Sequence, residues 1–189
     1  MHDISLKSAE SIYVKQFKIP DAYRQQVKQH FTEWIKLGVV QPARSKFNSP
    51  IFAVTKKNVR LCLVKDFCAF NTKTHTDKYH MKVSECIGEI GQSGSTIFST
   101  TDLTSGFWQM LLKPKSSQYT AFTISSMGRF QWVMMLMGLL GSLASFQRPM
   151  ETVIMGLTKI IMYINDLLHS GRTCSTVRHF AAKTKKLQH

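Results

Sequence analysis

Residues 159–170, KIIMYINDLLHS, constrain the fold more than any other stretch of this sequence. Two short apolar segments flank the pair Asn165 and Asp166, a pattern typical of a β-hairpin. An acidic residue between two buried strands has two interpretations, because it either forms a solvated turn or holds a metal ion. The run STIFSTTDL likewise ends near an acidic residue, Asp102. If the two strands are neighbours in an antiparallel sheet, Asp102 and Asp166 converge on one cation.

The net charge of the chain indicates which class of partner it binds. The sequence holds 25 Lys and Arg against 11 Asp and Glu, for a net charge of +14. Such an excess favours a polyanion, most simply RNA or DNA, through electrostatic steering and counterion release. An acidic membrane surface attracts basic proteins too, but the sequence shows no long basic amphipathic helix that would bind one. We therefore expect a nucleic-acid partner and no membrane.

Length and composition indicate a globular protein. The chain has 189 residues, of which 43% are hydrophobic and 19% charged, enough for one domain with a core. The start, MHDISLKSAE, lacks the apolar core of a signal peptide, and the run WVMMLMGLLGSLASF is too short to span a membrane. Its four cysteines form no CxxC pair, so neither a disulfide framework nor a zinc site is predicted. We expect an intracellular protein, cytoplasmic or nuclear, that is not secreted.

Helix and strand patterns are intermixed along the chain, which predicts an α+β fold. Residues 1–18 are expected to form a loose lead-in, residues 19–170 one domain, and residues 171–189 a basic tail. Helical spacing of apolar residues occurs in IPDAYRQQVKQHFTEWIKLG and again over residues 142–157. A loop is expected over residues 41–50. The strand-like runs are IFAVTKK, RLCLVKDF, STIFSTTDL, QYTAFTI and FQWVMML.

Several segments match a known family in order and spacing. They are VKQFKIPDAYRQQV, LGVVQPARSKFNSPIFAVTKK, DFCAFN, DKYHM, STIFSTTDLTSGFWQM, YTAF, FQWV, MGLLGSLASFQRPME and YINDLL. Over this span the chain resembles the reverse transcriptase of gypsy-like long-terminal-repeat retrotransposons. The resemblance implies a right-hand polymerase fold, with fingers and palm in residues 19–170 and an antiparallel palm sheet packed on helices.

The resemblance also implies an activity and a site. Such enzymes are RNA-directed DNA polymerases that act on an RNA or DNA template–primer and deoxynucleoside triphosphates with two Mg²⁺ ions. Asp102 matches the first palm aspartate. Tyr163, Asn165 and Asp166 match the Tyr-x-Asp-Asp hairpin, so that Asp102 and Asp166 are the expected metal ligands. Asn165 occupies the first position of the Asp-Asp pair, so that one of its two carboxylates is missing.

Further positions match those that contact nucleotide or template. Phe107 matches an aromatic gate against a ribose 2′-hydroxyl, although a plain core aromatic would have the same spacing. Arg60 would serve as a fingers cation only if the strand register slips by two residues. The positions that the resemblance assigns to nucleotide or template are Lys56, Lys57, Arg60, Phe107, Gln109, Gly138 and Tyr163.

The sequence departs from the family pattern at positions that bear on catalysis. Asn165 removes a negative charge from a site built for divalent cations. Cys62 and Cys68 fall where the pattern has Arg, and a thiol cannot replace the two-pronged grip of a guanidinium on phosphate. Pro149 falls inside a predicted helix, at a cost of about 3 kcal/mol. We expect the polymerase activity of this chain to be impaired or absent.

The other domains of a Pol polyprotein also bear on whether this chain is an active polymerase. A thumb, a ribonuclease H and an integrase are expected in the intact polyprotein and are absent from these 189 residues. Three interpretations stay open at this point. The chain is an active polymerase supplied with its other domains by another chain, a non-catalytic nucleic-acid-binding remnant, or the product of a decayed open reading frame.

Overall fold

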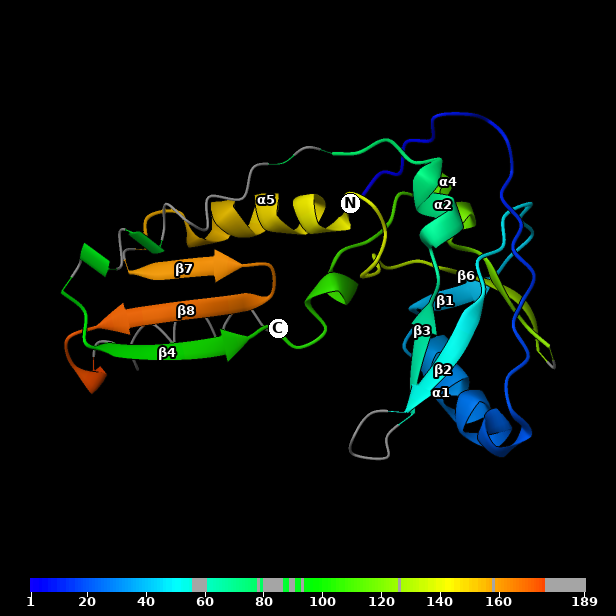
Figure 1. Ribbon diagram of the computed structural model, residues 1–189, viewed down its shortest axis with the longest axis horizontal. Helices are drawn as coiled ribbons and strands as arrows, with labels where there is room; N and C mark the ends of the chain where they lie inside the picture. The colour runs from blue at the N-terminus through cyan, green and yellow to red at the C-terminus, as the bar shows by residue number, and fades with distance from the viewer. Residues whose placement is uncertain are drawn as a thin grey trace. The chain divides into compact units, whose positions relative to one another are not determined.

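The computed structural model describes residues 1–55, 61–77, 79, 87–88, 91–92, 94–125, 127–157 and 159–175. The chain divides into two compact units, shown together in Figure 1. The first unit consists of Met1–Asp77 and Phe107–Ser142, and the second of Lys78–Gly106 and Leu143–His189. Both helices and antiparallel strands occur, as the α+β prediction requires. Within the described residues, no helix is both long and apolar enough to cross a bilayer.

A helix contributes to the core of the first unit. A 3-10 turn, Asp21–Tyr23, leads into α1 (Arg24–Lys36), and the left-handed Gly38 (φ +67°) follows its end. The predicted helix is confirmed. Its apolar face buries Phe31, whose ring meets the rings of Phe122 and Phe130 edge-on at centroid distances of 5.5 and 4.6 Å. These aromatic contacts fix α1 against the neighbouring sheet.

That sheet has the strand order β1–β6–β5 and is antiparallel. Its strands are β1 (Val40–Pro42), β5 (Phe122–Ile124) and β6 (Gly128–Trp132). Strand β1 reaches into the stretch that was expected to be a loop. Three residues are too few to show an alternating pattern, and the pairing of Val40 with Trp132 is a long-range contact that local sequence does not encode.

A two-stranded ladder also belongs to the first unit. Strands β2 (Ile51–Thr55) and β3 (Leu61–Lys65) pair antiparallel, with Thr55 opposite Leu61, which confirms the predicted hairpin partners. Helix α2 (Cys68–Thr72) follows β3. The shorter elements are α4 (Pro114–Ser117) and the 3-10 helices Gly106–Gln109 and Gln118–Thr120.

Several of the first 18 residues contact distant parts of the first unit, to which this segment belongs. Ile4 is buried, and Asp3 accepts hydrogen bonds from Ser116 Oγ (2.9 Å) and Lys113 Nζ (3.0 Å). Single β-bridges join His2 to Leu112, Leu6 to Thr74 and Tyr13 to Asn48. All three bridge partners lie far along the chain, which is why local sequence gave no sign of them.

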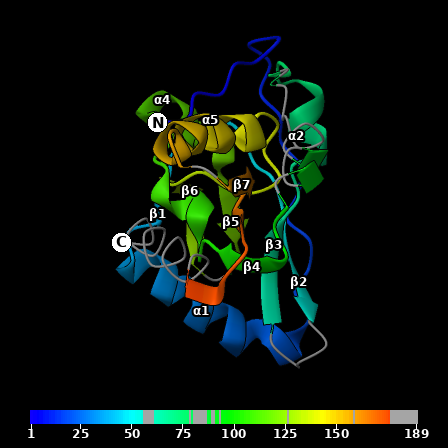
Figure 2. The same cartoon turned by 90° about the vertical axis from the view of Figure 1, so that its left-hand side faces the viewer.

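The second unit is built on one antiparallel sheet with the strand order β4–β8–β7. Figure 1 shows β8 (Asp166–Gly171) between β4 (Ile97–Asp102) and β7 (Ile160–Tyr163). The predicted β7–β8 hairpin is therefore confirmed. Helix α5 (Ser142–Ile154) runs beside this sheet in both views (Figures 1 and 2). It ends three residues before the predicted limit and contains Pro149 in its interior, as the sequence predicted.

Candidate active site

Two aspartates face each other at one end of the β4–β8 ladder. Asp102 ends β4, Asp166 begins β8, and the two are direct partners in the register. One step further, the Leu103 N–H donates to the Asn165 carbonyl over 2.8 Å. Because hydrogen-bonded and non-hydrogen-bonded pairs alternate along an antiparallel ladder, Asp102 and Asp166 form a non-hydrogen-bonded pair, in which opposite side chains lie closest. Both residues are exposed to solvent.

Asn165 lies beside this pair and interacts with it directly. Its side-chain amide Nδ2 donates a hydrogen bond to Asp102 Oδ1 over 2.5 Å. The amide of Asn165 can donate this hydrogen bond, whereas an ionised carboxylate in its place could only accept one and would repel a neighbouring carboxylate.

The turn of the hairpin differs by one residue from its simplest prediction. Tyr163 pairs directly with Asp166, so the two turn residues are Ile164 and Asn165 rather than Asn165 and Asp166. Ile164 has a positive φ of 59°, which is rare for a β-branched residue. A positive φ at the first turn position is typical of a type II′ turn, where Gly is preferred. The turn thus holds backbone strain next to the candidate site.

A buried glutamine on α5 holds this turn. Gln147 is 3% exposed, and its Oε1 accepts a hydrogen bond from the Ile164 N–H over 3.0 Å. Its Nε2 donates to the Met162 carbonyl over 3.2 Å. The hairpin backbone is thereby tied to the helix. Sequence reasoning assigned no role to Gln147, and the only local signal was a polar residue beside the apolar Phe146.

The same glutamine belongs to a longer network within the second unit. Gln147 Nε2 also donates to Glu151 Oε1 over 3.0 Å, and the Tyr79 hydroxyl donates to Glu151 Oε2. The Arg148 guanidinium lies 4.9 Å from the Tyr79 ring centroid. The hydrogen bond to Glu151 raises the pKa of Tyr79 above its ordinary value near 10. Tyr79 therefore stays a protonated donor at neutral pH.

The residues at the hairpin suit one oxygen-ligated cation. Asp102 and Asp166 provide carboxylates and Asn165 an amide oxygen, and Mg²⁺ prefers such hard oxygen donors. Across the part of the chain that the structure describes, no group of three or more His, Cys, Asp or Glu side chains could hold a metal ion. The donor set is therefore poorer in carboxylates than a site for two divalent cations demands.

Three of the residues assigned to the nucleotide or template belong to the first unit. Phe107 is buried in the 3-10 helix Gly106–Gln109, and Gln109 is exposed on the same helix. Gly138 has φ +93°, a conformation that favours glycine, and its carbonyl accepts a hydrogen bond from Asn71 Nδ2 over 2.8 Å. The Asn71 Oδ1 accepts from the Leu140 N–H over 3.0 Å, so this one side chain fixes the loop around Gly138.

Tyr163 ends β7 in the second unit and is exposed. The cations Lys56, Lys57 and Arg60 lie outside the described residues. The position of Arg60 relative to the fingers strands therefore stays a prediction.

The two cysteines at expected arginine positions carry no cationic side chain. Cys62 is half-buried on β3, directly opposite Val54. Cys68 is exposed at the start of α2, and Asp66 Oδ1 accepts a hydrogen bond from its backbone N–H over 2.8 Å. A hydrogen bond between the Cys68 thiol and Asp66 raises the pKa of the thiol. Neither side chain offers a positive charge to a phosphate.

Comparison with known proteins identifies the family. Residues 51–187 match the family of reverse transcriptases (RNA-dependent DNA polymerases), and the chain belongs to this family. It is a reverse transcriptase domain of retrotransposon or viral Pol origin. The enzymatic polyprotein of figwort mosaic virus is 32% identical over 174 residues, which cover 87% of this chain and 26% of the polyprotein. The Pol polyprotein from transposon opus of Drosophila melanogaster is 29% identical over 174 residues, 88% of this chain and 17% of that protein.

Solved structures share the fold. The native protease-reverse transcriptase of prototype foamy virus matches 99% of this chain and 24% of its own, with a TM-score of 0.83 and 21% identity. A foamy viral protease-reverse transcriptase in complex with an RNA/DNA hybrid matches 98% of this chain and 25% of its own, with a TM-score of 0.81 and 24% identity. The chain thus spans about a quarter or less of the length of each of these four proteins.

Proposed function

We propose that this reverse transcriptase domain binds template–primer nucleic acid and one Mg²⁺ ion but transfers nucleotides weakly or not at all. The observation that carries this proposal is the hydrogen bond from Asn165 to Asp102, at the position where the matching hairpin has a second carboxylate. Two-metal catalysis depends on carboxylates that hold both ions close to the reacting phosphate. An amide at this position lowers the negative charge of the site by one unit.

The proposed roles follow from the places of Asp102, Asp166, Gln147 and Asn165 in the second unit and from the family match of Phe107. Asp102 and Asp166 would hold Mg²⁺ from the facing ends of β4 and β8. When bound, Mg²⁺ supplies Lewis-acid polarisation of phosphate oxygens and lowers the pKa of a bound hydroxyl. Gln147 keeps the hairpin turn in place, and Asn165 orients Asp102. Phe107 would exclude a 2′-hydroxyl, as its match to the family's gate position indicates.

Charge and relatives support nucleic acid as the partner. The net charge of +14 favours a polyanion, and solved relatives of the same fold are complexes with double-stranded DNA and with an RNA/DNA hybrid. Lys56, Lys57 and Arg60 are the candidate fingers cations. The Drosophila transposons opus and 412, whose Pol polyproteins are similar to this chain, support a retrotransposon as the source of the domain, and the sequence motifs favour a gypsy-like one.

The metal proposal is tested by titrating the chain with Mg²⁺ while following its amide NMR spectrum. We expect saturable shifts centred on Asp102 and Asp166 that fit one weak site. The variants Asp102→Asn and Asp166→Asn should lose these shifts, whereas the matched control Asp21→Asn, an exposed aspartate of the first unit, should keep them. Two tight sites, or shifts that persist in Asp102→Asn, would overturn the proposal.

The nucleic-acid proposal is tested by fluorescence anisotropy with a labelled RNA–DNA template–primer. Because phosphate contacts release counterions, the affinity should fall at least roughly 10-fold between 50 and 200 mM salt. Duplexes of different sequence should bind equally. An affinity that stays flat over this range would contradict a phosphate-driven interaction.

A further inference from the structure

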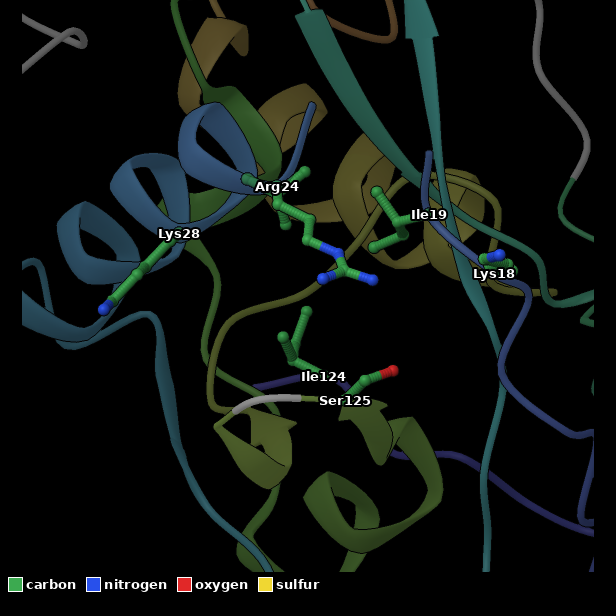
Figure 3. A pocket seen from close by; sticks show the side chains of 7 residues that line it. Lys18, Ile19, Arg24, Lys28, Ile124 and Ser125 are labelled. Atoms are coloured by element: carbon green, nitrogen blue, oxygen red, sulfur yellow. The ribbon is translucent and has the colours of Figure 1, made fainter. Parts of the chain in front are cut away.

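A cavity of about 320 Å³ lies within the first unit, beside the N-terminal half of α1 (Figure 3). Its walls come from the segment before α1, from α1 itself and from the end of β5. Every described lining residue belongs to the first unit, whereas the β7–β8 hairpin belongs to the second. Its volume falls at the lower end of the roughly 300–1,000 Å³ usual for small-molecule sites.

Part of this cavity is apolar. Val27 of α1 and Ile124 of β5 line it and are 3% and 5% exposed, and Ile19 adds a half-buried side chain. Figure 3 shows the guanidinium of Arg24 extending between Ile19 and Ile124. A ligand in the cavity would therefore meet aliphatic surface and a planar cation together.

The charged part of the cavity is basic. Lys18, Arg24 and Lys28 line it, and none of the described lining residues is acidic. Asp21, outside the lining, pairs with Arg24 at 2.7 Å, and both side chains are about 70% exposed, at 72% and 68%. An exposed pair of this kind contributes only about 0–1 kcal/mol, so it does not prevent Arg24 from binding an anion. The cavity therefore combines an excess of positive charge with apolar walls.

We infer that this cavity binds the phosphate ester of a nucleotide. The Arg24 guanidinium matches phosphate oxygens in a two-pronged contact, and Lys18 and Lys28 add positive charge at the rim. The exposed Ser125 hydroxyl offers a further donor. Ile19, Val27 and Ile124 contact the sugar or base that the phosphate carries. The same chemistry is present in a free nucleotide and in a phosphodiester of a single strand, and the experiment separates these two sources.

The test uses the full chain and deoxyadenosine monophosphate, with binding followed by NMR shifts of Val27 and Ile124. We expect saturable binding, with deoxyadenosine and inorganic phosphate each at least about 10-fold weaker. Arg24→Gln should weaken binding at least about 10-fold, a factor worth about 1.4 kcal/mol. The matched control Lys36→Gln, at the far end of α1, should bind as the unaltered chain does.

Two further variants test whether the cavity binds through Arg24 and independently of the hairpin. Asp21→Asn removes the competing ion pair but keeps Arg24, so its affinity should equal or exceed that of the unaltered chain. Asp102→Asn removes the candidate metal ligand of the second unit and should leave these shifts unchanged, so this inference and the proposed function can fail independently. Thermal unfolding of each variant shows whether a loss of binding follows from a loss of folding.

Competition with a short single-stranded oligonucleotide identifies the source of the phosphate. If the oligonucleotide displaces deoxyadenosine monophosphate at a phosphate concentration below that of the nucleotide, the cavity is a subsite for a single strand. If a higher concentration is needed, the cavity is a site for free nucleotide. Three results would overturn the inference. Arg24→Gln could bind the nucleotide as tightly as the unaltered chain does, or Lys36→Gln could lose as much affinity as Arg24→Gln. A short polyglutamate peptide could also displace the nucleotide as well as the oligonucleotide does. Each of these results would mean that the cavity does not recognise a nucleotide phosphate.

Discussion

The side-chain amide of Asn165 donates a hydrogen bond to the carboxylate of Asp102 over 2.5 Å, across the two strands that also place Asp166 opposite Asp102. This contact joins the turn residue Asn165 to the strand end that carries Asp102. A carboxylate at Asn165 would bring a third negative charge to the same end of the sheet, where a divalent cation would have to balance it.

Asn165→Asp should make the stability of the domain depend on Mg²⁺. Without divalent cations the variant loses the hydrogen bond to Asp102 and gains repulsion, so we expect a loss of about 1 kcal/mol in the free energy of unfolding. Millimolar Mg²⁺ should restore the loss, because a ligand that binds only the folded state stabilises it. Thermal unfolding with and without Mg²⁺ measures both effects.

The control for this experiment is Asn165→Ala, which loses the hydrogen bond without adding charge and should not recover in Mg²⁺. We also expect that Asn165→Asp alone does not restore primer extension, because Cys62 and Cys68 still lack the guanidinium groups of the family pattern. Full rescue by this single change would show that the other losses are tolerated.

Gln147→Ala should loosen the hairpin. The substitution leaves the Ile164 N–H and the Met162 carbonyl without their buried partner, at a cost of about 1–3 kcal/mol in the free energy of unfolding. Urea unfolding measures the loss, and faster hydrogen exchange at the Ile164 amide would assign it to the turn. Gln29→Ala, on the exposed face of α1, is the matched control and should change neither quantity. Unchanged protection of Ile164 in Gln147→Ala would contradict this assignment.

Pro149→Leu should stabilise the second unit. Pro149 lies in the interior of α5, where its ring removes a backbone donor and crowds the preceding turn, and it is exposed, so a larger side chain fits. We expect a gain of up to about 3 kcal/mol, seen as a higher unfolding temperature. The control is Pro114→Leu, since Pro114 begins α4 at a position that suits proline and should give no gain. Equal gains from both variants would show that the position inside the helix is not the cause.

The ammonium group of Lys65 is enclosed although the residue as a whole is half-buried. It donates to the carbonyls of Thr120 and Ala121, the latter over 3.0 Å, and lies 4.9 Å from the ring centroids of both Phe67 and Phe122. Desolvation in these surroundings lowers the pKa of Lys65 well below its ordinary value near 10.5. The folded chain therefore gives up this proton at a lower pH than the unfolded chain does.

This lowered pKa predicts how the stability of the domain changes with pH. Between the folded pKa of Lys65 and its ordinary value near 10.5, the unfolded chain binds more protons, so stability rises with pH. Lys65→Met removes this contribution. Urea unfolding from pH 7 to pH 10 should show the unaltered chain gaining stability relative to the variant. Parallel profiles, or a relative loss on raising the pH, would contradict the burial of a charged ammonium.

The β7–β8 hairpin could be predicted because its signal is local. Two apolar runs around polar turn residues specify it, and the family pattern assigns Asp102 and Asp166 to neighbouring strands, where the structure places them. The predicted turn residues, Asn165 and Asp166, are one position off, because Asn and Asp both favour turns whereas the register is set by pairing along the strands. The positive φ of Ile164 could not be predicted, because β-branched residues rarely adopt it and contacts outside the turn impose it.

The rest of the site depends on contacts between distant segments. Nothing near Gln147 in sequence indicates that its amide meets Met162 and Ile164, 15 and 17 residues further along the chain. The hydrogen bonds of Asp3 and Ile4 to Ser116 are likewise invisible in the local sequence. The cavity beside Arg24 likewise needs Ile124, about one hundred residues away, to close its floor. Each feature exists only once the fold has brought separate segments together.

The hairpin of this chain, as we propose, no longer supports efficient nucleotide transfer. Primer extension by the purified chain on an RNA template in Mg²⁺, compared with the Asp102→Asn variant, tests this proposal at the site itself. We expect extension by the unaltered chain to stay close to the background of Asp102→Asn. Robust extension that Asp102→Asn abolishes would contradict the proposal, and would show that the hairpin supports catalysis with Asn165 in place of an aspartate.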